Sequence, residues 1–105
     1  MIAHVELSSR AVKDLRRLDE ATHRRIDAVL RDFQKVPLPP NLDTKQLEGR
    51  APWQRARIGD LRIIYREFTP QELAGRTGER TGKGYLIARV VPRRDLEKAI
   101  RAMLR

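Results

Sequence analysis

Apolar side chains recur along the first part of the chain with the spacings of one strand and two helices. Residues 2–7 alternate between two sides of an extended chain, which predicts a short strand. Helical spacing from Ala11 predicts a helix to about Leu18, with Ser8 or Ser9 as its N-cap. A second helix is predicted from about residue 19, with the apolar stripe Ile26, Val29, Leu30 and Phe33. Their short polar joint predicts an antiparallel helical hairpin, which the prolines of residues 36–40 end.

The period changes to two in the middle of the chain, after a segment around residues 45–49 that we expect to be a loop. Residues 53–58 and 61–66 flank Gly59-Asp60, which is the pattern of a β-hairpin with a two-residue turn. This turn fixes the register, because Ile58 then pairs with Leu61 and each following pair is set. One face is predicted to join the core, and it carries Gln54, Ala56, Ile58, Leu61, Ile63 and Tyr65.

The last third of the chain predicts a loop, a strand and a helix. Residues 69–84 are polar and rich in glycine, which indicates an extended basic loop. Residues 85–91 are apolar on both sides, as expected of a central strand, and Pro92 ends that strand. Residues 94–104 have one apolar face and predict a terminal helix. We therefore expect a single α+β domain over residues 1–105, with its helices on one side of a mainly antiparallel sheet of about four strands.

Charge adds the first indication of function. The chain has 105 residues, with 23 Lys or Arg against 14 Asp or Glu and a net charge of +9. Residues 1–49 are nearly balanced, with nine basic and eight acidic side chains, whereas residues 50–105 have fourteen and six. A concentrated positive potential favours nucleic acid, an acidic partner protein or anionic lipid. Lipid is the weakest of these, because no basic amphipathic helix with bulky apolar anchors is present.

Several classes of protein are disfavoured by what the sequence lacks. There are no cysteines, so neither a disulfide scaffold nor a thiolate metal site can form. No apolar run approaches the roughly 18 residues of a membrane span, and no signal-peptide pattern begins the chain, so we expect a cytoplasmic protein. Neither His4 nor His23 lies in a catalytic motif, and no glycine-rich phosphate loop is present. We expect no metal and no cofactor.

The second face of the predicted β-hairpin concentrates positive charge. Besides Ile64 it carries Trp53, Arg55, Arg57, Arg62 and Arg66. Like charges opposite each other, as at Arg57 and Arg62, destabilise a strand pair by up to about 1 kcal/mol. One interpretation is that carboxylates of the chain, such as Glu48, Asp60 or Glu67, neutralise this face. The other is an anion site, because guanidinium groups bind phosphate through paired hydrogen bonds.

Three further residues bear on the anion-site interpretation. Trp53 on the same face is either a stacking platform for a base or an anchor of the core. Arg89 and Arg93 are an even number of positions apart, so both lie on the same side of the last strand. Both extend the basic face if that strand lies beside the hairpin.

Three segments of the sequence, residues 45–49, 53–65 and 89–95, resemble the RelE/ParE superfamily of bacterial toxins. The expected order of helices and strands also matches over nearly the whole chain. The resemblance implies the toxin of a type II toxin-antitoxin system, bound by an antitoxin whose C-terminal segment wraps around it. RelE-like members cleave mRNA in the ribosomal A site without a metal, whereas ParE-like members poison DNA gyrase.

The resemblance also implies roles for particular residues. Arg55 and Arg57 match a basic pair on a strand, Arg62 the arginine after the hairpin turn, and Arg93 the arginine after the last strand. In RelE-like enzymes this set binds RNA phosphate and stabilises the reaction. Glu97 stands where the family often has a tyrosine or histidine for proton transfer. The expected catalytic set is Arg57, Arg62, Arg93 and Glu97, and the expected RNA-binding set is Trp53, Arg55, Arg57, Arg62, Arg66 and Arg89.

Three functional hypotheses follow. The first is an endoribonuclease toxin that inhibits translation by cutting mRNA on the ribosome, with mRNA, 16S rRNA and an antitoxin as partners and no membrane partner. The second is a toxin that inhibits gyrase, because the usual tyrosine or histidine is replaced by Glu97. The third is a degenerate member that only binds an acidic peptide or nucleic acid. In the first case the basic residues of the 69–84 segment, Arg76, Arg80 and Lys83, are candidate contacts to ribosomal RNA.

Overall fold

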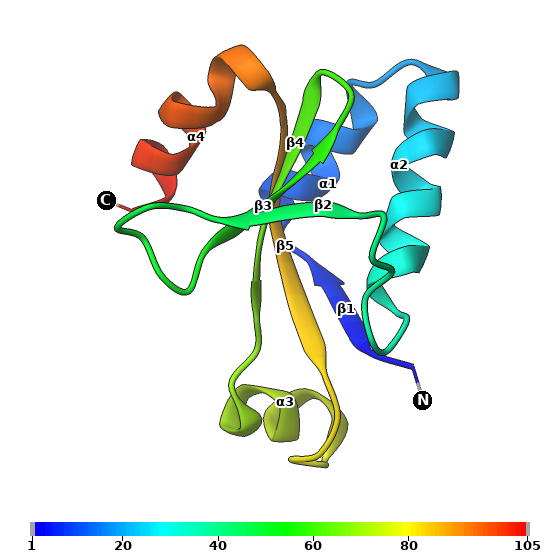
Figure 1. Ribbon diagram of the computed structural model, residues 1–105, viewed down its shortest axis with the longest axis vertical. Helices are drawn as coiled ribbons and strands as arrows, with labels where there is room; N and C mark the ends of the chain where they lie inside the picture. The colour runs from blue at the N-terminus through cyan, green and yellow to red at the C-terminus, as the bar shows by residue number, and fades with distance from the viewer. Residues whose placement is uncertain (1, 105) are drawn as a thin grey trace.

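The computed structural model describes residues 2–104, which form one five-stranded sheet with helices on both of its faces (Figure 1). The strand order is β1-β5-β4-β3-β2, in which β1 is parallel to β5 and the other neighbours are antiparallel. The strands are β1 His4–Leu7, β2 Asp43–Gln46, β3 Gln54–Ile58, β4 Leu61–Glu67 and β5 Gly84–Pro92. The predicted α+β class and mainly antiparallel sheet are confirmed, with five strands where about four were expected.

The helical hairpin forms much as its apolar stripes predict. Helix α1 spans Ser9–Arg16 and begins at the N-cap Ser8, whose Oγ accepts the amide of Ala11 at 3.0 Å. Helix α2 spans Glu20–Phe33, and Asp19 is its N-cap. The two helices cover one face of the sheet over a core that includes Ile26, Phe33, Ala56, Ile63, Tyr65 and Ile87. The hairpin face that was predicted to join the core does so.

The terminal helix lies on the opposite face of the sheet, so the expectation that all helices share one side is wrong (Figure 1). A short 3₁₀ helix, η1 Arg93–Asp95, leads into α4 Leu96–Met103. Ala99 and Ile100 of α4 pack with Leu47, Ile64 and Val91. The physical reason is that Ile64 and Val91 give this face its own apolar patch, which α4 removes from water.

The central β-hairpin has the predicted register. Ile58 pairs with Leu61, and Arg57 lies directly opposite Arg62. Strand β2 on the other side of β3 was predicted as part of a loop, and that prediction was wrong. All four residues of β2 are exposed and polar, so it lacks the apolar alternation that identifies a half-buried strand. Its backbone pairing with β3 makes it an edge strand.

The segment predicted as an extended loop contains helix α3, Pro70–Thr77, so that prediction was also wrong. Thr69 and Glu72 form a capping box, Pro70 occupies the first turn, and Gly78 ends the helix with φ of 81°. Glu72 binds Arg66 of β4 through two hydrogen bonds of 2.7 Å. Helix α3 is therefore fastened to the end of the sheet away from the Gly59-Asp60 turn (Figure 1).

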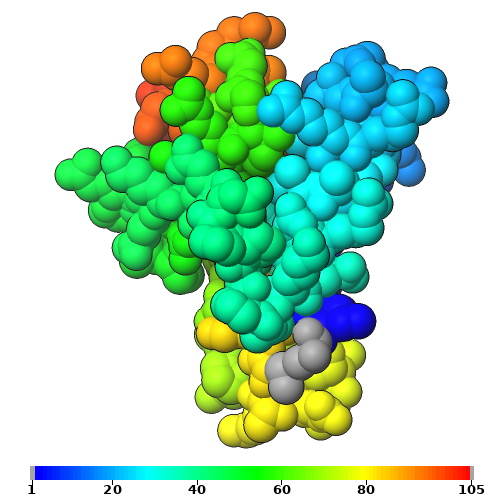
Figure 2. All heavy atoms as spheres, turned by 45° about the vertical axis from the view of Figure 1, so that its right-hand side comes forward, coloured from blue at the N-terminus to red at the C-terminus, as the bar shows by residue number. Residues whose placement is uncertain are grey.

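The opposite end of the molecule brings three separate segments together. Figure 2 shows the tip of the β3–β4 hairpin in green, with the start of the α4 region in orange on one side and the α1–α2 region in blue and cyan on the other. The backbone links two of them, because the amide of Arg93 donates to the carbonyl of Asp60 at 2.8 Å. Among residues 2–104, no helix is both long and apolar enough to cross a membrane.

Candidate functional site

The site is built around the turn that joins β3 to β4. Gly59 has φ of +56°, a left-handed backbone conformation that residues with a side chain rarely adopt. Arg62, three residues later, turns its guanidinium back onto this turn: Nη1 donates to the carbonyl of Gly59 at 3.0 Å and to that of Leu61 at 2.9 Å. Arg62 is only 6% exposed. The turn therefore fixes the position of a nearly buried positive charge.

Two other arginines lie close to Arg62. Arg57 is its partner across the strand pair, and Arg93 is brought to the turn by its backbone hydrogen bond to Asp60. The pKa of Arg62 is lowered mainly by burial, and the positive charges of Arg57, Arg93 and Arg55 lower it further. The cluster formed by Arg57, Arg62 and Arg93 is called the turn arginine cluster below. Its charges repel one another, so an anion bound among them gains stability.

Carboxylates of the chain neutralise other arginines but not this cluster. Within residues 2–104, the arginines that form ion pairs are Arg24, Arg50, Arg55, Arg66, Arg76 and Arg89. None belongs to the turn arginine cluster. Of the acidic residues considered as neutralising partners, Glu67 pairs instead with Lys83 at 3.0 Å. Asp60, in the turn itself, acts on Arg62 through its charge, which raises the pKa of Arg62, but it forms none of the ion pairs found within residues 2–104. The interpretation of a neutralised face therefore holds for Arg55 and Arg66, and the anion-site interpretation fits the cluster.

Arg55 and Arg66, which were grouped with the cluster from the sequence, have partners of their own. Arg55 Nη1 binds the carboxylate of Asp43 on β2 at 3.1 Å. Arg66 lies four residues from Arg62 along β4, which corresponds to about 13 Å of strand. Its ion pair holds the pKa of Glu72 at about 2 and raises the pKa of Arg66. Arg66 is thus a structural contact between α3 and the sheet.

Trp53 lies with Arg66 and not with the turn. The Arg66 guanidinium carbon is 5.7 Å from the centre of the Trp53 ring, and Trp53 is partly buried against the core under α4. Of the two roles that the sequence left open for Trp53, this packing fits the anchor.

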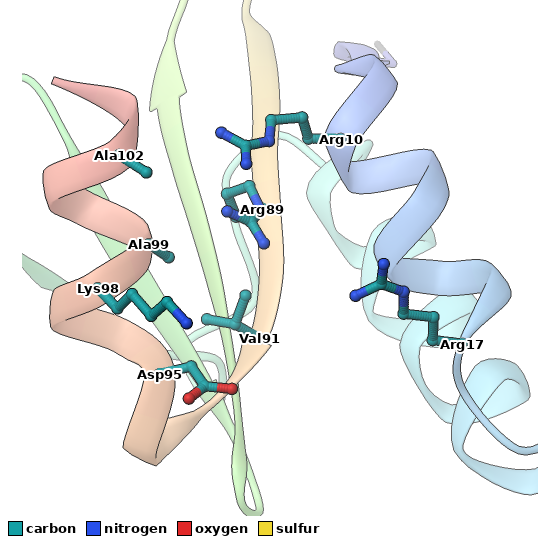
Figure 3. Close-up of a pocket in the computed structure, with 8 residues that line it drawn as sticks. All are labelled: Arg10, Arg17, Arg89, Val91, Asp95, Lys98, Ala99 and Ala102. Atoms are coloured by element: carbon teal, nitrogen blue, oxygen red, sulfur yellow. The ribbon is translucent and has the colours of Figure 1, made fainter. Parts of the chain in front are cut away.

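Arg89 lies on the face of Arg62 and Ile64, as its parity predicts, but its guanidinium is paired with Asp14 and does not join the turn arginine cluster. Its Nε binds Asp14 Oδ2 of α1 at 2.9 Å, and the same oxygen accepts the amide of Val90 at 2.9 Å. Arg89 pairs with Ile64, on the side of the β-bulge nearer the Gly59-Asp60 turn, so the bulge does not change the face on which Arg89 lies. It lines a separate cavity of about 270 Å³ between α1 and α4 (Figure 3), together with Arg10, Arg17, Val91, Asp95, Lys98, Ala99 and Ala102.

The candidates for proton transfer are spread over the molecule. Glu97 lies on the first turn of α4, exposed, with Oε2 at 3.4 Å from Arg50 Nη2. The Tyr65 hydroxyl donates to Gln54 Oε1 at 2.9 Å, and burial raises the pKa of both Tyr65 and Tyr85. His23 pairs with Asp27 on α2 at 3.1 Å. Of these groups, only Glu97 lies on α4, the helix that follows the 3₁₀ helix of Arg93.

No group of three or more His, Cys, Asp or Glu side chains suited to a metal occurs in the part of the chain that the structure describes.

One residue near the turn was not predicted from the sequence to lie there. Arg25 of α2 lies over Gly59: a methyl group on Gly59 would be 3.0 Å from Arg25 Nη1. The available signal was the absence of an acidic residue three or four positions away on α2, where helical ion pairs form.

The fold is similar to structures of known toxins. Archaeal RelE in its complex with RelB from Pyrococcus horikoshii has a TM-score of 0.65 and 28% identity, with 89% of this chain and 97% of that chain covered. The RelBE2 toxin-antitoxin complex of Mycobacterium tuberculosis has a TM-score of 0.65 and 22% identity, covering 89% and 100%. Isolated RelE of Escherichia coli has a TM-score of 0.61 and 13% identity, covering 97% and 99%. No curated protein matches the sequence.

The class of protein is therefore a type II toxin of the RelE/ParE superfamily, as the sequence resemblance implied. The family model of the ParE toxin of the type II toxin-antitoxin system parDE matches residues 5–97. The chain belongs to this family.

Proposed function

We propose that this toxin is a metal-independent endoribonuclease that acts in the cytoplasm on mRNA held by the ribosome. The observation that carries the proposal is the nearly buried Arg62, which has no carboxylate partner within residues 2–104 and is fixed beside two further arginines. Such a cluster suits a phosphodiester whose negative charge increases during reaction. Its position at the exposed end of a hairpin suits a substrate presented by a larger particle.

The proposed reaction begins with attack of a ribose 2′-oxygen on the adjacent phosphorus. A new P–O2′ bond forms, the P–O5′ bond breaks, and the products are a 2′,3′-cyclic phosphate and a free 5′-hydroxyl. Charge builds on the non-bridging oxygens of the pentacoordinate state, where Arg57, Arg62 and Arg93 stabilise it electrostatically. The preorganised Arg62 contributes most, since its guanidinium is already anchored to the turn and needs no reorganisation.

Proton transfer is assigned to Glu97 in this proposal. A base must accept the 2′-hydroxyl proton and an acid must protonate the departing 5′-oxygen, and arginine is a poor acceptor. Glu97 is exposed on the first turn of α4, in the element that follows Arg93, and its Oε2 lies 3.4 Å from Arg50 Nη2.

The partners follow from the same proposal. RelE is bound to RelB in the Pyrococcus horikoshii and Methanococcus jannaschii structures, which supports an antitoxin partner for this chain. The mRNA and 16S rRNA are the further partners of a ribosome-dependent nuclease. The net charge of +9 favours their association with the toxin.

The proposal is tested by mapping new mRNA 5′ ends in bacteria after controlled expression of the chain. The unsubstituted toxin is expected to arrest growth and to cut within translated frames, and Arg62→Ala/Arg93→Ala is expected to do neither. The matched control is Arg24→Ala/Arg101→Ala, which removes the same charge from exposed positions on α2 and α4. Cuts that persist in the first variant, with its fold checked by circular dichroism, would contradict the proposal.

Inhibition of DNA gyrase is the second candidate, and two observations favour it. The matching family model is that of ParE, and no tyrosine or histidine follows Arg93 at the start of α4. Growth arrest without cuts in translated frames, together with loss of gyrase supercoiling in vitro, would support this function in place of the nuclease.

A further inference from the structure

Arg25 of α2 lies against the β3–β4 turn, and the function proposed above leaves this arginine unused. Its neighbours three and four positions away are Ala21, Thr22, Ala28 and Val29, so the helix offers it no carboxylate. Arg24 beside it differs, because Arg24 Nη1 binds Glu20 at 2.8 Å. Arg25 also forms none of the ion pairs found within residues 2–104.

The contact between Arg25 and the turn is close at Gly59. A Cβ atom built on Gly59 would lie 3.0 Å from Arg25 Nη1, 3.4 Å from Nη2 and 3.5 Å from Cζ. All three distances involve the guanidinium, so this group lies directly over the backbone of Gly59. Two arginines therefore meet the turn at Gly59. Arg62 donates a hydrogen bond to its carbonyl, and the Arg25 guanidinium lies beside its Cα.

The two guanidinium groups approach the turn from opposite faces of the sheet. Arg62 shares the face of Ile64, which α4 covers, whereas Arg25 comes from α2 on the other face. The tip of the hairpin between them is exposed at Gly59 and Asp60. A single-stranded polynucleotide that crosses this tip presents one phosphate per nucleotide, so adjacent phosphates can contact the two faces.

We propose that Arg25 forms a second phosphate-binding position, on the α2 side of the Gly59-Asp60 turn, for the phosphate next to the one held by the turn arginine cluster. The inference rests on the proposed function, because it takes RNA as the ligand. It assigns Arg25 to binding and register of the strand, not to the chemical step. Its guanidinium is placed to form paired hydrogen bonds with phosphate oxygens.

The test measures the salt dependence of RNA binding by the full-length chain. The probe is a fluorescein-labelled 2′-O-methyl oligouridylate, which lacks the attacking hydroxyl, and binding is followed by fluorescence anisotropy. Each phosphate neutralised on a single strand contributes about 0.7 to the slope of log K against log salt. Arg25→Gln is expected to lower the slope by about 0.7, and Arg25→Lys to restore it. The matched control Arg24→Gln is expected to leave the slope unchanged, because that guanidinium is bound to Glu20.

Arg62→Ala separates this inference from the proposed function. A lower slope in Arg62→Ala with an unchanged slope in Arg25→Gln would overturn the second phosphate position and leave the nuclease site standing. An unchanged slope in both variants would overturn both the second phosphate position and phosphate binding by Arg62. No measurable binding by the unsubstituted chain would overturn the second phosphate position, and the nuclease proposal would then be decided by the map of mRNA 5′ ends alone. Melting temperatures of all variants are compared first, so that a loss of fold is not taken for a loss of contact.

Discussion

Arg62 owes its position to local rules that are visible in the sequence. The two-residue turn sets the register, the register places Arg57 opposite Arg62, and both features are found in the structure. Arg25 and Arg89 depend instead on tertiary structure: Arg25 reaches the turn from another layer, and the guanidinium of Arg89 is bound by Asp14 of α1. Alternation along a strand predicts neither event, because both involve elements far away in the sequence.

At Gly59, substitution by alanine should destabilise the protein by about 1–2 kcal/mol, the usual cost of left-handed backbone for a residue with a Cβ. The methyl group would also press on the Arg25 guanidinium, 3.0 Å away. Gly75→Ala is the matched control, since Gly75 lies in α3 with open space around its Cα. That change should stabilise the protein by about 0.5–1 kcal/mol. Urea unfolding measures both, and equal effects would contradict this account of the turn.

Among the elements, those with a strong apolar pattern were predicted and those without it were not. Helices α1 and α2 and strands β3 to β5 bury regular stripes or faces. Strand β2 is entirely exposed, so only its pairing with β3 defines it. Helix α3 had a signal that was passed over: Thr69, Pro70 and Glu72 spell a capping box with proline in the first turn. The side of the sheet that α4 covers is determined by the apolar patch of Leu47, Ile64 and Val91, and the pattern of α4 alone does not predict it.

The attachment of α3 to β4 should depend on pH through Glu72. Its pKa falls from an ordinary 4.5 to about 2, chiefly because its carboxylate binds Arg66. A lowered pKa in the folded state gives stability that is present above about pH 4.5 and is lost as the pH falls toward 2. Glu72→Gln should therefore be less stable than the unsubstituted chain at neutral pH, and the difference should vanish near pH 2.

Urea unfolding over a pH series measures this difference. Glu79→Gln is the matched control, because Glu79 lies just beyond α3 and forms none of the carboxylate ion pairs found within residues 2–104. A Glu72→Gln difference that stays constant from neutral pH to pH 2 would show that the ion pair does not hold α3 in place.

On the scale of the whole molecule, the arginines that form ion pairs near α3 and the arginines grouped at the β3–β4 turn occupy different ends. The end that carries α3 uses its charges internally, in the pairs Arg66–Glu72, Arg76–Glu6 and Lys83–Glu67. The opposite end gathers Arg25, Arg57, Arg62 and Arg93 around one turn, and none of them has a carboxylate partner within residues 2–104. This grouping of arginines around one turn supports a polyanionic substrate there.

The central claim is that the turn arginine cluster stabilises the transition state of RNA cleavage. Its most direct test is the single-turnover rate at which the purified toxin cuts mRNA on purified translating ribosomes. Arg62→Ala should lower this rate by about 10²–10³-fold, the effect of removing one preorganised donor, while the exposed Arg101→Ala should leave it unchanged. Equal rates for Arg62→Ala and the unsubstituted toxin, or no cutting by either, would contradict the account.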